Sequence, residues 1–455
     1  MNRTRLLAAL VPVLGLMPIA AGIQPEPPAS SRAVSEAHKP EPYQRVHSES
    51  PDKVALQMAV REFAPPREGL PTIYLAGAVH IARPEFYAGL QEFLDAQDMV
   101  LFEGVKPPGS GDPALDLERA ATNEQKARLT GRRVRLVAMA AERYRAEHDG
   151  YPTSMKQLRE GAERRIADLL KVGVMDAWGN PLIFEAREKG FDVYSLGADN
   201  QPGGDGGDAD IRYSDQKKLS RAETGDRGDG LQSKLAGALG VVFQLDAMDH
   251  NKPNWRNSDL SIDQVQARLE RAGADDSGLF SMLSGDSLGS KLVGFVLNML
   301  SARPEDQAKL RIMMIEMISM ADQLMDAAPG GMGAMMRVIL DDRNEVVLLD
   351  LRRLVDSEDP PGTIAVIYGA GHLPAIETAL VRELGYRPAG DVWHTAMESD
   401  AGSAGMTVRD FTQFRTMIGT MMEKQLEQAR KQKNRAAKKR PAASEDEAVP
   451  AGDRR

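Results

Sequence analysis

Two apolar runs of nearly the same pattern stand far apart in the chain, at residues 72–80 and 363–372. Each is rich in Ile, Val, Leu and Ala and ends in Gly-x-x-His, with the histidines at His80 and His372. Such a run predicts a β-strand, and the glycine at its end allows the backbone to turn sharply. We therefore expect both imidazoles just beyond strand ends, where open α/β sheets gather ligands and catalytic groups.

A third apolar run, residues 99–105, delivers Glu103 beside a glycine. Two histidines and one glutamate are a usual ligand set for a catalytic divalent ion that keeps open positions, and hydrolysis is its simplest chemistry. Arg343 lies just before the apolar residues 346–349 and would hold a carboxylate or polarise a carbonyl. Taken singly, these residues also suit helix caps, salt bridges and surface turns. The predicted site therefore depends on the whole set.

These motifs resemble those of the TraB/PrgY/GumN family, whose relatives include the Tiki metalloproteases that cleave Wnt proteins. The resemblance rests on the paired Gly-x-x-His motifs, on the Phe-Glu-Gly around Glu103, and on Arg343-Asn344 before an expected late strand. Residues 243–260 are also similar to the middle region of that family.

The resemblance covers roughly residues 51–118 and 216–400. It implies an α/β fold of the erythromycin esterase-like TraB type, split into two halves, with a metal-dependent hydrolase site. The implied ligands of a divalent transition metal are His80, Glu103 and His372, and the implied catalytic residues are Glu103 and Arg343.

The segment between the two halves has a different pattern. Residues 132–154 place apolar or small residues at helical spacing and then stop at a glycine shortly before a proline. Turn-forming residues follow at 176–181, with short alternating runs at 182–185 and 191–195. A helix followed by small antiparallel strands predicts a separate α+β domain.

This segment resembles the soluble domain of the type II secretion major pseudopilin, general secretion pathway protein G. The matching motifs are Tyr151-Pro152, Asp176-Ala-Trp-Gly-Asn-Pro181, residues 194–199 and the Gly/Asp-rich loop that ends at Ile211. Pseudopilins need a long apolar N-terminal helix, whereas residues 122–133 are polar. We therefore expect a binding or spacer module inserted in a surface loop, without assembly into a pseudopilus by the usual route.

The resemblance further implies Ca²⁺ in the last loop of this domain. Its carboxylates are hard oxygen ligands, and its glycines allow backbone carbonyls to turn inward. The spacing does not match an EF-hand, and a solvated acidic turn has the same composition. The expected calcium ligands are Asp199, Asp208 and Asp210.

The chain begins with a basic start, a short apolar core and small residues, which predicts a signal peptide over residues 1–22. We expect the mature protein to be exported, to the periplasm or beyond; an uncleaved anchor is the alternative. Residues 23–50 are rich in Pro, Ser, Glu and His and predict a disordered linker.

The remaining predicted boundaries follow from these patterns. The first TraB-like half spans 51–118, the inserted domain 119–215 and the second half 216–406. Residues 407–455 predict a C-terminal helix, docked through one apolar face, and a disordered basic tail. Weak attraction of the basic stretch to an anionic membrane surface is an alternative role. The methionine-rich residues 310–336 predict a packed helix, or else an adaptable apolar groove.

Composition narrows the function classes. The chain has no cysteine, which excludes disulfides and a thiol nucleophile, and its net charge of −9 argues against nucleic-acid partners. The leading hypothesis is an exported metal-dependent hydrolase, peptidase-like, with a peptide or protein substrate. The alternatives are a non-catalytic binding protein for a peptide or signal, and an accessory of type II secretion whose partners are secretion-system components.

Overall fold

A computed structural model describes residues 39–115, 122–188, 190–218, 242–272, 303–320 and 338–439. The predicted signal peptide, the linker up to residue 38 and the tail beyond residue 439 lie outside the described residues. Residues 321–336 of the methionine-rich segment also lie outside the described residues.

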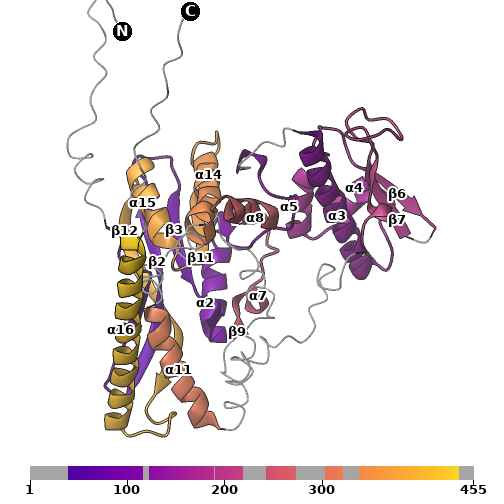
Figure 1. The fold of residues 1–455 in the computed structure, drawn as a ribbon. Coiled ribbons are helices and arrows are strands. Elements are labelled where there is room, and N and C mark those ends of the chain that lie inside the picture. The colour runs from indigo at the N-terminus through magenta and orange to yellow at the C-terminus, as the bar shows by residue number, and fades with distance from the viewer. Residues whose placement is uncertain are drawn as a thin grey trace, which may run out of the picture. The chain divides into compact units, whose positions relative to one another are not determined.

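The main sheet has seven strands in the order β1–β2–β3–β11–β5–β10, and β12 also pairs with β2 (Figure 1). The strands are β1 (Gln44–His47), β2 (Lys53–Ala64), β3 (Thr72–Ala78), β5 (Met99–Phe102), β10 (Trp255–Asn257), β11 (Thr363–Gly369) and β12 (Arg387–Asp400). β3, β11, β5 and β10 pair in parallel. A short antiparallel pair, β4 (Ile81–Ala82) and β9 (Val242–Phe243), forms a sheet of its own. Because β3, β11, β5 and β10 run in the same direction, their carboxyl ends lie at one edge of the main sheet.

The two strands that precede the Gly-x-x-His motifs are direct neighbours. Thr72 lies opposite Thr363, and the register continues to Ala78 opposite Gly369. Both strands are almost continuously buried, as expected for a parallel sheet whose two faces are covered. The prediction of a strand before each histidine is confirmed.

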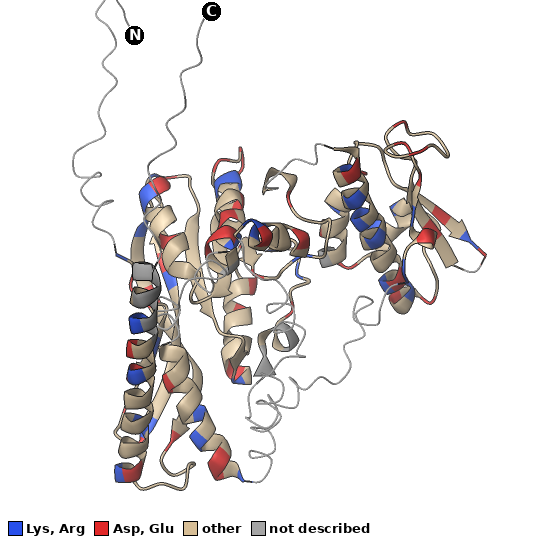
Figure 2. Cartoon of the chain, viewed as in Figure 1, with Lys and Arg blue, Asp and Glu red and all other residues tan. Residues whose placement is uncertain are grey.

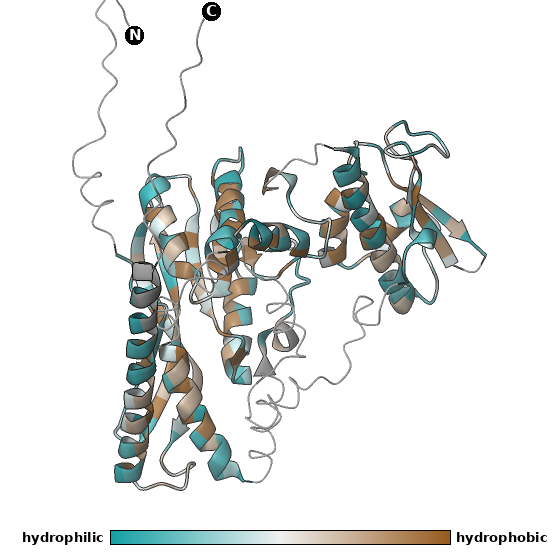
Figure 3. Cartoon of the chain, viewed as in Figure 1, coloured by the Kyte–Doolittle hydropathy of each residue, from teal (hydrophilic) through white to brown (hydrophobic). Residues whose placement is uncertain are grey.

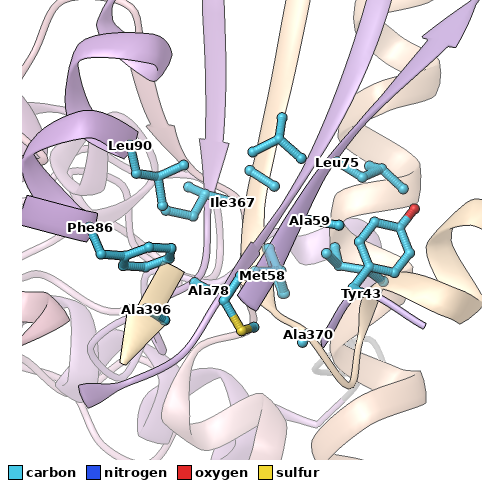
Figure 4. Packing of buried hydrophobic residues seen from close by; sticks show 14 of the residues in the cluster. Tyr43, Met58, Ala59, Leu75, Ala78, Phe86, Leu90, Ile367, Ala370 and Ala396 are labelled. Atoms are coloured by element: carbon cyan, nitrogen blue, oxygen red, sulfur yellow. The ribbon is translucent and has the colours of Figure 1, made fainter. Parts of the chain in front are cut away.

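The described residues outside 123–215, which we call the main unit, also form helices, several of which share one hydrophobic core with the sheet. These helices are α2 (Pro84–Asp95), α7 (Gln244–Ala247), α8 (Ile262–Arg271), α11 (Pro304–Ser319), α14 (Arg343–Val355), α15 (Leu373–Glu383) and α16 (Val408–Lys439), with short turns η1 (Pro113–Leu115) and η3 (Val338–Asp342). α2 starts with proline, whose fixed φ suits a first helical position. Its Phe86 and Leu90 join Ile367 of β11 in the core shown in Figure 4.

Two predictions about the main unit are wrong. The late strand expected after Arg343 is the helix α14, because its buried residues Val347, Leu351 and Val355 recur at helical spacing. The expected disordered linker over 23–50 contains β1, which pairs antiparallel with β2. A strand of four residues that begins next to the buried Tyr43 is too short for a periodicity signal.

The predicted C-terminal helix is confirmed as α16, with its buried face formed by Phe411, Ile418, Met422 and Leu426. Val408, the first residue of the helix, is 49% exposed and does not belong to this face. Much of the remaining surface of α16 is hydrophilic (Figure 3), and basic and acidic residues both occur along it (Figure 2). Attraction of its basic end to a membrane surface stays a prediction.

Residues 123–215 form an α+β unit with a hydrophobic core of its own. Its elements are α3 (Asn123–His148), α4 (Met155–Gly161), α5 (Arg164–Gly173), β6 (Ile183–Arg187), β7 (Gly190–Ser195), β8 (Ile211–Arg212) and η2 (Tyr213–Asp215). The strands form an antiparallel sheet in the order β6–β7–β8. Thr122 and Gln125 form a reciprocal capping box, so α3 starts earlier than the apolar pattern predicts. The predicted helix and two strands are confirmed.

Phe411→Ala is expected to lower the free energy of unfolding of the main unit by about 3–5 kcal/mol, since it removes a fully buried ring from α16. Denaturant unfolding followed by tryptophan fluorescence measures this. The control is Met417→Ala on the same helix; Met417 is 60% exposed, so a change of about 0.5 kcal/mol or less is expected. Equal losses in both variants would contradict docking of α16 through Phe411.

Candidate functional site

Four chain segments bring polar side chains to the carboxyl edge of the parallel strands. Glu103 directly follows β5, while His80, His372 and Asp259 closely follow β3, β11 and β10. Because the four strands are parallel neighbours, these residues meet at one edge. Together with Arg343, the first residue of α14, they form what we call the strand-end site.

Arg343 bridges two carboxylates in this site. Its Nε and Nη2 donate to the two oxygens of Asp259 at 2.9 and 2.6 Å, and Nη2 also donates to Oε1 of Glu103 at 2.7 Å. Asp259 is fully buried, and the Arg343 side chain is 11% exposed. Paired bonds from one guanidinium to a carboxylate are strong and fix its orientation. Arg343 therefore holds carboxylates, one of the two roles expected from the sequence.

Glu103 is held as an ionised carboxylate. Its Oε2 accepts the backbone N–H of Gly369 at 2.8 Å, so the ends of β5 and β11 are tied together. Burial by itself would raise the pKa of Glu103, but Arg343, His372 and the Gly369 N–H favour the charged form and together lower it. The site thus keeps a negative charge at neutral pH.

His372 is buried and oriented by an amide. Its Nδ1 lies 2.8 Å from Oδ1 of Asn344, an oxygen that only accepts hydrogen bonds, so the ring proton belongs on Nδ1. Its Nε2 lies 3.7 Å from Oε1 of Glu103. Burial lowers the pKa of His372 against the opposing effect of Glu103, and Arg343 also lowers it. A neutral imidazole therefore presents its Nε2 lone pair on the side of Glu103, as a metal ligand would.

His80 differs from His372 because it is exposed. A protonated imidazole at this position would be close enough to Glu103 to lower the pKa of that carboxyl group. Among the described residues, no three His, Cys, Asp or Glu side chains are placed to hold one ion together. Nε2 of His372 and Oε1 of Glu103 face each other as two potential donors, and the exposed His80 would have to approach them to complete a set of three. The metal site stays a prediction.

Asp259 is the residue that sequence reasoning missed. Besides Arg343, it accepts the backbone N–H groups of Gly104 at 2.8 Å and Leu260 at 2.7 Å. It follows a strand of only three residues, which gives no periodicity. Its sequence position does indicate a role, because Asp259 follows a strand that begins with the aromatic Trp255, much as Glu103 follows β5.

A second buried polar cluster lies in the α+β unit around Asp176, which is 2% exposed. Its Oδ1 accepts the backbone N–H groups of Trp178 and Asn180 at 3.0 and 2.8 Å, and its Oδ2 accepts the hydroxyl of Ser195 at 2.7 Å. Asn180 donates from Nδ2 to the carbonyl of Gly197 at 3.0 Å. This explains the Asp-Ala-Trp-Gly-Asn pattern: the aspartate closes the turn and fixes it to β7.

The expected calcium ligands lie in the loop between β7 and β8. Oδ1 of Asp199 accepts the N–H of Gln201, and Oδ1 of Asp210 accepts the N–H of Gly203, both at 3.0 Å. Oδ2 of Asp210 also accepts from Arg212 at 2.9 Å. These bonds organise the loop through the same carboxylates that calcium would use.

The backbone of Asp208 lies close to two glycines of this loop. A Cβ added at Gly197 or Gly204 would lie 2.5 or 2.6 Å from the carbonyl oxygen of Asp208. Both glycines also have positive φ, 73° and 79°. Any other residue at either position would clash with this carbonyl and be strained. The close turn therefore depends on the two glycines, whereas calcium binding stays a prediction.

Comparisons with known proteins bear on this α+β unit. The family "Type II secretion system (T2SS), protein G" matches residues 119–214. The type II secretion system core protein G of Pseudomonas aeruginosa is 30% identical over 112 residues, which cover 79% of that protein and 22% of this chain. The chain belongs to the type II secretion system protein G family. No solved structure matches it.

The matched residues 119–214, which we call the protein G domain, confirm the predicted resemblance to a pseudopilin. The residues of the strand-end site lie outside this match. The main sheet lies outside the match, so membership of the TraB family stays a prediction. Within the described ranges, no helix combines the length and apolar character needed to cross a bilayer. In particular, α3 of the protein G domain is polar in its first turns.

His372 is expected to make the stability of the metal-free protein depend on pH. The unfolded chain protonates this histidine near its ordinary pKa, whereas the folded protein does so only at a lower pKa. Its contribution is therefore full above the ordinary value and falls as pH drops from about 7 to 5. His372→Gln is expected to flatten this part of the profile of unfolding free energy against pH. An unchanged slope would contradict a buried neutral imidazole.

Proposed function

We propose that the main sheet carries a divalent-metal hydrolase site that acts on a peptide or protein. The observation that supports this proposal is the contact of Glu103 with Arg343 and His372 at one edge of parallel strands, with His80 in the loop that follows the neighbouring strand β3. The sequence predicted these residues as a set although they are spread over almost the whole main unit. Perturbed, buried ionisable groups grouped in this way are typical of functional sites.

The side chains have distinct roles in this proposal. His372, with its ring fixed by Asn344, and Glu103, with Oε2 anchored on Gly369, would hold the ion, with His80 as the third ligand. When bound, a divalent ion acidifies water and polarises a carbonyl group. The low pKa of His372 keeps its lone pair available for this ligation at neutral pH.

Arg343 would stabilise the developing oxyanion. Its Nε and Nη2 are committed to Asp259 and Glu103. Nη1 of Arg343 makes no hydrogen bond to any residue that the structure describes, so it is the group that would donate to a substrate oxygen. A fixed guanidinium is well suited to this task because it does not have to reorganise during the reaction.

The alternative is a binding protein that uses the same site to capture a peptide without cleaving it. Capture and cleavage would both place a carbonyl or carboxylate group of the peptide near Arg343, and the same fold suits both. They differ in outcome, since capture returns an intact peptide and catalysis returns fragments.

The test is metal analysis and peptide cleavage with the mature full-length protein. About one transition-metal ion per chain is expected in the wild type, and loss of the ion and of cleavage in His80→Ala/His372→Ala. The control is His47→Ala/His394→Ala, which changes two histidines of β1 and β12 outside the site. Metal without cleavage would favour capture, and metal content independent of His80 and His372 would refute the proposed site.

A second proposal concerns the protein G domain: we propose that it binds components of a type II secretion system after export of the chain, and that Ca²⁺ stabilises the loop between β7 and β8. The family match supports the first part, and the cluster of Asp199, Asp208 and Asp210 supports the second. The polar start of α3 favours a binding module over a subunit of the fibre itself.

Calcium is expected to raise the unfolding temperature of this domain in the full-length protein and to strengthen capture of purified secretion-system pseudopilins. Asp208→Asn/Asp210→Asn should abolish the rise, because two of the three proposed carboxylates are removed. Asp215→Asn, in η2 after the loop, is the matched control. Differential scanning calorimetry with and without a calcium chelator measures the first effect, and a pull-down measures the second. Pseudopilin capture that is absent under all conditions would count against the secretion role.

A further inference from the structure

Arg343 shares its charge unequally between two carboxylates. Two of its three short bonds go to Asp259, at 2.6 and 2.9 Å, and one goes to Glu103, at 2.7 Å. Breaking the single bond to Glu103 would leave the paired geometry with Asp259 intact. The guanidinium is therefore bound more firmly to Asp259 than to Glu103.

The oxygen of Glu103 that Arg343 contacts is also the one nearest to His372. Oε1 lies 2.7 Å from Nη2 of Arg343 and 3.7 Å from Nε2 of His372. The second oxygen, Oε2, is committed to the backbone of Gly369. A cation held by His372 and Glu103 would therefore meet the guanidinium at Oε1, where two positive charges repel each other.

Asp259 is built to stay in place during such an exchange. It is fully buried and is fixed by the backbone N–H groups of Gly104 and Leu260 in addition to Arg343. A buried carboxylate without its cation is costly, so Asp259 retains Arg343 whether or not Glu103 does.

We propose that Arg343 and a divalent cation compete for Glu103, and that Asp259 decides the outcome by retaining Arg343. This inference rests on the proposed metal site. Without the cation, Arg343 neutralises Glu103 and keeps it ordered. With the cation, Arg343 withdraws to Asp259, and the Nη2 hydrogen released from Glu103 becomes a second donor, beside Nη1, for a substrate oxygen. Cation binding thus prepares the oxyanion donor.

The competition predicts opposite effects from two substitutions. Arg343→Gln removes the competing charge and is expected to tighten binding of the cation about tenfold or more. Asp259→Asn leaves the whole charge of Arg343 on Glu103 and is expected to weaken binding by a similar factor. A role that is only structural would weaken binding in both variants. In the double variant Arg343→Gln/Asp259→Asn, the second substitution should change cation affinity less than it does alone, because Arg343 is no longer there to compete for Glu103.

The measurement is titration of the chelator-treated full-length protein with Co²⁺, followed by its visible absorption and repeated in His372→Ala to isolate binding at this site. Circular dichroism checks the fold of each variant. Should Asp259→Asn fail to fold, the sign of the change in Arg343→Gln still decides. The matched control is Arg61→Gln: Arg61 is a buried arginine of β2 that also bridges two carboxylates, Glu377 and Asp391, and its loss should leave His372-dependent affinity within about twofold.

The outcomes separate this inference from the proposed function. Tighter His372-dependent binding in Arg343→Gln, unlike Arg61→Gln, supports the competition. If the wild type binds Co²⁺ through His372 but Arg343→Gln binds it equally or more weakly, the competition is refuted and the metal site stands. If neither protein shows His372-dependent binding, both proposals fail.

Discussion

The parallel pairing of β3, β11, β5 and β10 is the constraint on which the strand-end site depends. Parallel strands cannot be joined by tight turns, so each must be reached by a long connection. The same geometry places the carboxyl ends of all four strands at one edge. His80, Glu103, Asp259 and His372 therefore come together from distant parts of the sequence. The in-register pairing of Thr72–Ala78 with Thr363–Gly369 sets the two histidine loops side by side.

Charge balance gives this edge its second level of order. Glu103 and Asp259 would repel each other if they were alone, and the single positive charge of Arg343 reduces this repulsion through short bonds to both. The arrangement has a structural counterpart in the same unit, since Arg61 holds Glu377 and Asp391. That second network also receives the hydroxyl of Tyr43 and includes no histidine among these contacts. Neutral imidazole beside the carboxylate is what distinguishes the strand-end site chemically.

Sequence reasoning found the parts of this molecule that carry strong local signals. The long apolar runs before His80 and His372, the helical spacing in α16 and the alternating runs of the protein G domain all gave the observed elements. It failed where tertiary contacts decide the structure. β1 and β10 are too short to show a period, so no local pattern indicates the strand before Asp259. The apolar residues after Arg343 suggest a strand, although their burial follows a helix. Whether His80 reaches Glu103 and His372 depends on distances between loops, which no local pattern encodes.

The placement of the protein G domain between β5 and β10 has a consequence for the order in which the chain folds. β5 ends at Phe102 and its parallel partner β10 begins at Trp255, while β11, the other partner of β5, begins only at Thr363. The protein G domain, by contrast, has a hydrophobic core and a sheet that are both formed within residues 123–215. During synthesis, contacts close in sequence form before distant ones become possible. The protein G domain can therefore complete its fold first, while the strands that frame Glu103 still wait for the C-terminal half of the chain.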